Sequence, residues 1–264
     1  MSSVAISGNA SGAGVLTIAA PNTASNYTLT LPTQTGTIVS GSTTSNAVIP
    51  AGTTSLAPIL LTSGTKLTSA TAGAIEYDGK VVYGTPIGTQ RGIIPTQQYY
   101  RLDSALAGAN VSTAQSIFGV GATLSASTVY EFEITVQMIK TAGSTSHSIG
   151  IGYGGTATIN NIIYQYSGQL HTATDSSGTA GPIFGGFHQT ATNTNMTGAT
   201  GALTTLYFWL IMKGTVSINA GGTFIPQYTC SAAPGGAYSM QAGSYIQINP
   251  LSASGAATNV GTWA

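Results

Sequence analysis

Residues 129–139, VYEFEITVQMI, constrain the fold most, because apolar and polar side chains alternate along the whole stretch. Successive side chains of a β-strand point to opposite faces of a sheet, so this pattern predicts one long strand. One face of that strand is expected in a core, and it carries Tyr130, Phe132, Ile134, Val136 and Met138. The other face, which carries Glu131 and Glu133, is expected to meet water.

Five later segments have the same strand-forming character, with turns rich in Gly, Asn, Ser and Thr between them: SIGIGYGG, NIIYQYSG, TTLYFWLIMKGTVSIN, TFIPQYTCS and SYIQINPL. Short strands at this spacing are typical of a β-sandwich. We therefore expect residues 99–264 to form an antiparallel β-sandwich, with Trp209 in its core. The single candidate helix is Thr113 to Phe118, with Asn110 and Ser112 as possible caps and Gly119 at its end.

The first 40 residues contain two short alternating segments that each end in proline, GVLTIAAP and NYTLTLP, followed by GTIVSG. Charged residues are absent before Lys66. So few strands cannot close a core, and an isolated two-stranded piece is marginal in water. Residues 1–40 are therefore expected to bury their apolar side chains against sister copies or another surface, the candidates being Val15, Leu16, Ile18, Tyr27, Leu29, Leu31 and Ile38.

Residues 41–98 are expected to form a linker that ends in a β-hairpin. The part from 41 to 74 is rich in Ser, Thr, Gly and Ala and contains LAPILLTSGT, which predicts one more short strand. In AIEYDGKVVYGT, residues 74–85, Asp78 and Gly79 separate two β-rich runs, which favours a type I′ turn. Glu76 and Lys80 are placed where they could pair across that turn.

Composition excludes several classes of function. Charged residues make up 5% of the 264-residue chain and the formal net charge is zero, whereas an ordinary soluble domain carries about 25% charged residues. Six scattered cations cannot form the basic face that a nucleic-acid binder needs. The longest apolar run, LYFWLIM at 206–212, is far shorter than the ~20 residues that span a bilayer, and Met1 is not followed by a signal-peptide pattern. We expect a protein made in the cytoplasm, without membrane insertion.

Candidate metal-binding and redox residues are few. Cys230 is the single cysteine, which indicates a buried thiol that fills space in the core rather than a disulfide or thiolate cluster. His147, His171 and His188 lack ligand spacing, apart from His171 with Asp175. An ion held on a trimer axis by one histidine per chain is the alternative to ordinary structural histidines. No cofactor is expected.

Catalytic motifs are equally sparse. Glu131 and Glu133 lie two positions apart on one strand, with carboxylates roughly 7 Å apart. A glycoside hydrolase needs its acid and base on opposite sides of the scissile bond, so solubilising residues on a wet face are the preferred interpretation. Asp175 lies in a Ser- and Gly-rich loop four residues after His171, and no GxSxG-like nucleophile turn accompanies them. The chain is not expected to be an enzyme.

Aromatic residues in or beside glycine-rich segments are the candidate contact surface. Their rings could stack on sugars or on a protein partner, and the alternative is that they lie in the core or between subunits. The candidates are Tyr153, Tyr164, Tyr166, Phe184, Phe187 and Tyr238, together with Tyr99 and Tyr100.

Several phrases in combination resemble a family of tailed-bacteriophage virion proteins, in which an LTLPxxTGT strand unit and an AIEYDG hairpin precede a terminal β-sandwich. They are NYTLTLPTQTGTI, GAIEYDGKVVYGT, VYEFEITV, HSIGIGYGGTATI, the long segment KGTVSINAGGTFIPQYTCSAAPGGAYSMQAGSYIQINPL, and GTWA. The resemblance covers most of the chain. It implies a trimeric component of the virion, with a jelly-roll-like sandwich at its tip and no shared catalytic activity.

The resulting interpretation is an all-β homotrimer in a phage particle. Three intertwined N-terminal segments, in a β-prism-like arrangement, would turn their apolar sides and free strand edges toward one another, which accounts for their lack of charge. The sandwich would contact other virion proteins of the tail or capsid, or a host-surface glycan or protein. A capsid decoration protein is the alternative within this class, and a glycan-degrading tailspike that uses Glu131, Glu133 or Asp175 is an alternative from another class.

Overall fold

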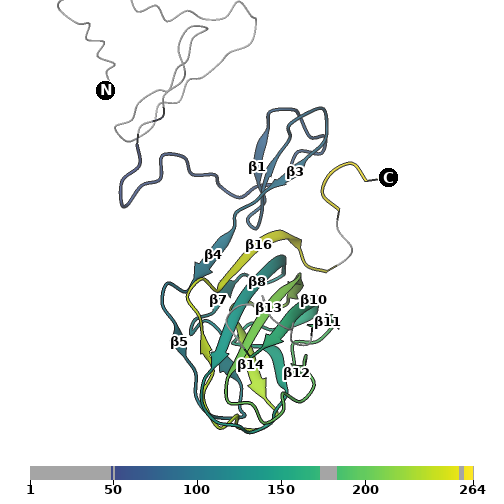
Figure 1. Ribbon diagram of the computed structural model, residues 1–264. Coiled ribbons are helices and arrows are strands. Elements are labelled where there is room, and N and C mark those ends of the chain that lie inside the picture. Colours follow the sequence, from purple (N-terminus) through teal and green to yellow (C-terminus); the bar gives the residue numbers. More distant parts are fainter. Residues whose placement is uncertain (1–48, 50, 173–182, 256–258, 264) are drawn as a thin grey trace, which may run out of the picture. The chain divides into compact units, whose positions relative to one another are not determined.

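The computed structural model describes residues 49, 51–172, 183–255 and 259–263 (Figure 1). The chain divides into two units, Met1–Ile59 and Leu60–Ala264, and all strands of the described residues lie in the second. These residues form strands, turns and bends without a helix, which confirms the all-β prediction. The candidate assembly residues from Val15 to Ile38 and the predicted β-prism-like segment lie outside the described residues. The predicted boundaries at residues 40/41 and 98/99 remain predictions.

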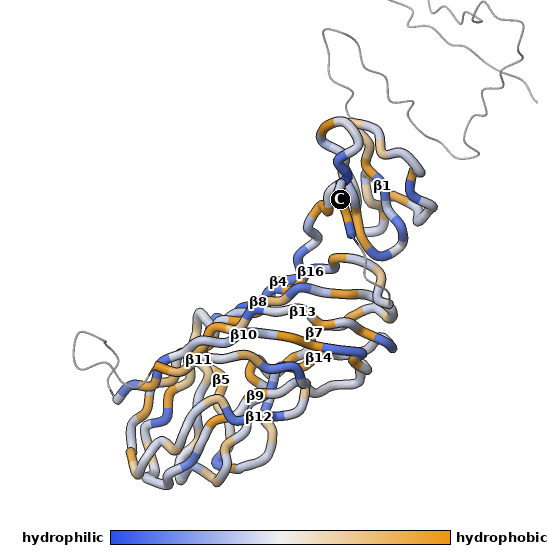
Figure 2. Tube along the Cα trace, turned by 90° about the vertical axis from the view of Figure 1, so that its right-hand side faces the viewer, coloured by the Kyte–Doolittle hydropathy of each residue, from blue (hydrophilic) through white to orange (hydrophobic). Residues whose placement is uncertain are grey.

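Two antiparallel sheets form the sandwich, and Figure 2 shows them as separate layers. The eight-stranded sheet contains β11 (Ile183–His188), β10 (Ile159–His171), β13 (Leu206–Ile218), β8 (Thr128–Lys140), β15 (Ser239–Met240) and β5 (Leu106–Ala107), with β16 (Tyr245–Ala253) between β8 and β4 (Gln98–Arg101). The five-stranded sheet contains β12 (Thr194–Asn195), β9 (Ile149–Gly154), β14 (Gly222–Cys230) and β6 (Gln115–Ser116), with β7 (Ala122–Leu124) also paired to β14.

The alternation in residues 129–139 sets the inner face of β8, as predicted. All five apolar residues of that face, from Tyr130 to Met138, are buried. β13 pairs with β8 along its whole length and buries a second row against the five-stranded sheet. The predicted strands at β9, β10, β13, β14 and β16 are confirmed, and Cys230 is a buried thiol, also as predicted.

An aromatic cluster fills the centre of the core. Phe132 of β8 lies with its ring centroid 5.5 Å from Tyr153, 6.2 Å from Tyr164 and 5.8 Å from Phe224. Gly214 of β13 lies in register between Phe132 and Tyr164. Because glycine has no side chain, the rings from the two flanking strands approach each other above it.

Lys140 ends β8 with its side chain inside the sandwich. Its Nζ donates hydrogen bonds to the carbonyl oxygens of Gly143 and Leu203, each at 2.7 Å. Burial lowers the pKa of this ammonium group. The loops that contain Gly143 and Leu203 therefore supply hydrogen-bond acceptors to a charge that the alternation of β8 places in the core.

The hairpin is confirmed, but its predicted details are wrong. β1 (Ile75–Tyr77) pairs with β2 (Val82–Gly84), and β3 (Gly92–Ile94) adds a third strand. Four residues, 78–81, make the connection instead of a two-residue turn. The Asp78 carboxylate explains this, because Oδ1 accepts hydrogen bonds from the backbone N–H groups of Lys80 and Val81, at 3.0 and 2.9 Å, and so closes a wider loop.

Glu76 pairs with Arg91 and not with Lys80. Arg91 Nε lies 2.8 Å from Glu76 Oε2, and this hydrogen bond lowers the pKa of the glutamate. The third strand accounts for the difference, because β3 begins directly after Arg91 and brings that residue beside the hairpin. The strand predicted in the linker is also wrong: residues 51–74 contain no strand, and LAPILL has no strand partner within the described ranges.

The predicted helix at Thr113–Phe118 is wrong. Gln115 and Ser116 form the short strand β6 and pair with Tyr228 and Gln227, and Ile117 and Phe118 are buried in the core. Burial of two adjacent apolar side chains at the sandwich edge outweighs a weak local helix preference. Trp209 is also not in the core, because it occupies an outward position of β13 between the buried Phe208 and Leu210.

Candidate functional site

The structure separates six of the predicted aromatic contact residues into three groups: buried, half-buried and strongly exposed. Tyr153, Tyr164 and Tyr238 are buried, so their prediction as surface contacts is wrong. They occupy inward positions, where the rings of Tyr153 and Tyr164 pack 5.2 Å apart. Tyr166 and Phe184 are half-buried, with Tyr166 stacked on His188 and Phe184 stacked on Phe208.

Phe187 is the one member of the six that is strongly exposed, with 68% of its surface accessible. It belongs to a wider outer face of the eight-stranded sheet that sequence reasoning missed. Trp209, 45% exposed, and Ile211, 40% exposed, project from the same face. Ile163 of β10 and Ile183 of β11 extend it. An exposed group of large apolar side chains on one sheet face is characteristic of a contact surface.

Polar side chains separate these apolar residues. In the strand register, Gln169 and Gln137 lie on either side of Trp209, and Ser167 and Thr135 lie on either side of Ile211. Amide and hydroxyl groups keep the face hydrated in the free chain without adding charge. Strict alternation in β13 could have identified this face, because Trp209 and Ile211 share parity with Lys213.

Glu131 and Glu133 lie on this face, and both line a pocket of about 230 Å³ together with Lys213 and Gln247. Glu131 Oε1 lies 3.5 Å from Lys213 Nζ, and Glu133 accepts a hydrogen bond of 2.9 Å from the Tyr245 hydroxyl. Each carboxylate therefore has a structural partner. The two carboxylates project from the same face of one strand, whereas the acid and base of a hydrolase lie on opposite sides of the scissile bond. Asp175 lies outside the described residues.

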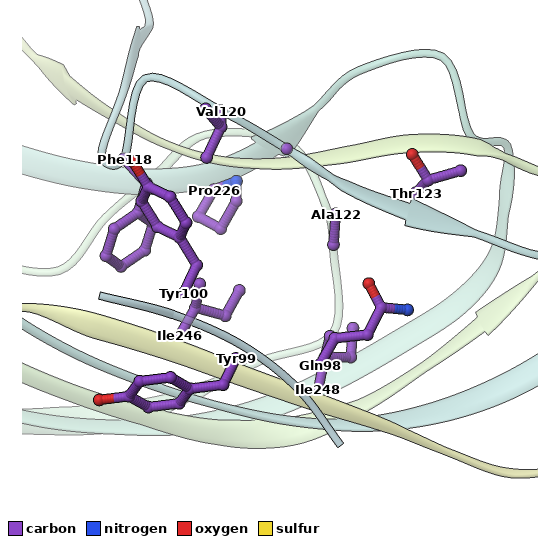
Figure 3. Close-up of a pocket in the computed structure, with 11 residues that line it drawn as sticks. Gln98, Tyr99, Tyr100, Phe118, Val120, Ala122, Thr123, Pro226, Ile246 and Ile248 are labelled. Atoms are coloured by element: carbon purple, nitrogen blue, oxygen red, sulfur yellow. The ribbon is translucent and has the colours of Figure 1, made fainter. Parts of the chain in front are cut away.

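A pocket of about 330 Å³ opens at one side of the sandwich, between β4 and β16 of one sheet and β7 and β14 of the other (Figure 3). Figure 3 shows Phe118, Val120 and Pro226 along one wall and Tyr100 with Ile246 along the other, and the Tyr99 side chain on the far side of β4. The lining is mainly apolar, and Gln98 and Thr123 are its polar side chains.

Both sheets end at this pocket. Among the described residues, β4 pairs with β16 alone and β7 pairs with β14 alone. Each therefore presents an outer edge of backbone N–H and C=O groups. Free edges beside an apolar pocket are sites where an extended segment can add as a further strand. The sequence carries no periodic signal for this pocket, because residues distant in the chain line it.

The histidines serve structural contacts. His147 is buried, with Nε2 2.8 Å from the Tyr238 hydroxyl and Nδ1 2.8 Å from the Thr145 carbonyl oxygen. His188 packs between the rings of Tyr164 and Tyr166. Within the described ranges, no three His, Cys, Asp or Glu side chains lie close enough together to hold a metal ion.

His147 predicts a loss of stability in mild acid. Burial lowers its pKa below the ordinary value of 6.5, and the nearby Lys140 ammonium adds to this effect. The unfolded chain therefore binds this proton first, and stability falls as the pH drops below 6.5 through the folded-state pKa. We expect His147→Gln to be less sensitive to pH than the natural chain when urea midpoints are compared at about pH 7.5 and 5. Equal sensitivity of the two proteins would contradict the prediction.

Comparisons with known proteins give little similarity. No family model matches the chain, and no curated protein matches it. Two solved structures are similar in part: infectious bursal disease virus Gx strain, at 10% identity over 70% of this chain and 51% of that chain, with a TM-score of 0.15, and the VP2 subviral particle of infectious bursal disease virus, at 10% identity over 75% and 53%, with a TM-score of 0.12. The chain spans about half the length of these viral proteins, and such TM-scores do not establish a shared fold.

A search for membrane-spanning helices gives a negative result. None of the described residues forms a helix long and apolar enough to cross a membrane.

Proposed function

We propose that this chain is a non-enzymatic structural subunit of a bacteriophage virion. It acts as a homotrimeric fibre or appendage, and its sandwich contacts the host surface or other virion proteins. The phage assignment depends on the sequence resemblance, and the subunit role depends on surfaces that the single chain leaves uncovered.

One observation carries the proposal: the segment LAPILL, residues 56–61, is exposed. Leu56, Ile59, Leu60 and Leu61 are all exposed large apolar residues, and Leu60 is 81% accessible. No ionisable side chain occurs between residues 49 and 65. Each fully buried side chain of this kind contributes about 1.5–3 kcal/mol. A cluster of four therefore favours association strongly, because 41% to 81% of the surface of each residue is exposed and still available to be buried.

The charge balance agrees with assembly from identical copies. The formal net charge is zero, so copies do not repel one another at long range. The outer face centred on Trp209 and Ile211 adds a second apolar surface for contacts. In a trimer it occurs three times, and three weak contacts act together through their effective concentration.

Sedimentation of the full-length protein at micromolar concentration tests the proposal. We expect a species of three times the 26.5 kDa chain mass, with no folded monomer. A stable, folded monomer would overturn the trimer. Release of reducing ends from host polysaccharide, lost on changing Glu131 or Glu133, would overturn the non-enzymatic assignment.

A capsid decoration protein is the alternative assignment, and the exposed apolar side chains of the outer face favour it because they could adhere to a capsid. Particle images with the chain located distinguish the two roles. A projecting position at the tail or a vertex supports the fibre or appendage, and a regular lattice on the head supports decoration.

A further inference from the structure

The open side of the sandwich lacks a strand. The outer edges of β4 and β7 flank the apolar pocket, and all four residues of β4 are exposed. Val120, 46% exposed, and Tyr100 lie at the same opening. A strand edge with apolar side chains around it is unfavourable in water unless something covers it. No Asp, Glu, Lys, Arg or His lines this pocket, so an apolar, uncharged segment would suit it.

The same chain contains an uncovered segment of matching chemistry. LAPILL has no strand partner among the described residues, and Pro58 and Ile59 form a bend there; in an extended strand its apolar side chains would alternate between two sides. Leu56, Pro58 and Leu60 share one side, and Ala57, Ile59 and Leu61 share the other. A segment that is apolar on both sides is typical of a strand covered on both faces. Proline is accepted on an edge strand, where one N–H group is not needed.

We infer that residues 56–61 of one copy add as a strand to the open side of the sandwich of a neighbouring copy, and place apolar side chains in the pocket between β4 and β7. This inference depends on the proposed homotrimer. One side of the added strand meets Tyr100, Phe118 and Val120. The other side lies beside Tyr99, which is exposed on the far side of β4.

A neighbouring copy is the favoured source because the proposed homotrimer supplies two further copies of the segment. Exchange of an identical element between copies creates no new chemistry and is a low-cost route to an oligomer. Within a trimer the segment is present at an effective concentration in the millimolar range, so modest affinity for the pocket is sufficient.

Cross-linking between singly substituted chains tests this directly. Leu60→Cys and Val120→Cys are placed on two differently tagged full-length chains that are expressed together and treated with a short bis-maleimide. Burial raises the pKa of the native Cys230 thiol to about 11, so it reacts slowly at neutral pH. Since each chain has one reactive cysteine, a product that carries both tags joins two copies. The control partner is Ser167→Cys, on the exposed outer face of β10.

A product between Leu60→Cys and Val120→Cys chains, and not with Ser167→Cys, supports the inference. A doubly substituted chain that links only within itself overturns it. A trimer in sedimentation that gives no product between the Leu60→Cys and Val120→Cys chains overturns the inference and leaves the proposed function standing. A monomer overturns the proposed function.

A charge placed at the pocket gives a second test, which uses Leu60→Cys alone and no engineered cysteine in the pocket. In the Val120→Glu background, the thiol of Leu60→Cys should react with a maleimide about tenfold faster than in the natural background. The reason is that a carboxylate at the pocket disfavours apolar contact and leaves the thiol less protected. Val111→Glu is the matched control, since Val111 is also exposed and does not line the pocket. Equal labelling in the two variants would overturn the inference.

Discussion

Replacing Phe132 with alanine is expected to lower the free energy of unfolding by about 3–5 kcal/mol, the range for loss of a large aromatic side chain from a core. Phe132 is fully buried, and its ring contacts Tyr153, Tyr164 and Phe224. Removing it leaves a cavity that three other rings cannot fill without leaving their own positions. Urea unfolding followed by tryptophan fluorescence, at one fixed protein concentration, measures the effect.

Phe187→Ala is the matched control for this substitution. The chemical change is identical, but Phe187 is strongly exposed on β11, so we expect a change within about 0.5 kcal/mol. Similar losses from both variants would mean that the aromatic cluster does not determine the stability of the sandwich.

Replacing Gly214 with alanine is expected to destabilise the sandwich by about 3 kcal/mol or more, at the upper end of the range for overpacking. A methyl group at this position would overlap the Ile163 carbonyl oxygen and lie 2.5 Å from the Tyr164 Cβ. Neither neighbour can move away, because the carbonyl belongs to the paired strand β10 and the ring of Tyr164 is held by Phe132. Thermal unfolding at fixed protein concentration measures this effect.

Gly198→Ala is the control for the glycine substitution. No atom lies within 4 Å of the methyl group that alanine would add there, so stability should change little or rise slightly as the unfolded chain loses freedom. A Gly214→Ala protein as stable as the Gly198→Ala protein would contradict the close approach of β10 and β13.

These two core positions also concern the proposed function. Phe132 and Gly214 lie beneath the outer face that carries Trp209 and Ile211, because alternate residues of β13 point to opposite sides of one sheet. A tightly packed inner face holds in place the strands that carry the outer face. We expect a contact surface on a rigid sheet to lose little conformational entropy on binding.

Local sequence patterns were sufficient to predict six strands of the sandwich, β8, β9, β10, β13, β14 and β16. Residues from Tyr130 to Met138 alternate without interruption, and a strand that is half in water leaves this pattern in any sequence. The same reasoning was ambiguous in LYFWLIM, where every side chain is apolar. It placed Trp209 in the core, whereas the parity of Phe208 and Leu210 directs Trp209 outward.

The wrong predictions for the helix at residues 113–118 and for the exposed tyrosines have a different cause. Pairing with Tyr228 and Gln227 makes β6 a strand, and packing between two sheets buries Tyr153, Tyr164 and Tyr238. The residues that form these contacts are far apart in the sequence. Their position in or beside glycine-rich segments favoured a contact surface, whereas glycines such as Gly214 allow close approach of side chains within the core.

The sequence by itself determined the class of the fold, the inward and outward faces of β8, the hairpin at β1 and β2, and the scarcity of charge. Each of these depends on neighbouring residues or on composition. Only the tertiary structure decided which apolar residues remain exposed, that the two sheets end at an open pocket, and which carboxylates are already paired. Those properties arise from contacts between segments far apart in the chain, and a local sequence pattern does not predict which distant segments meet.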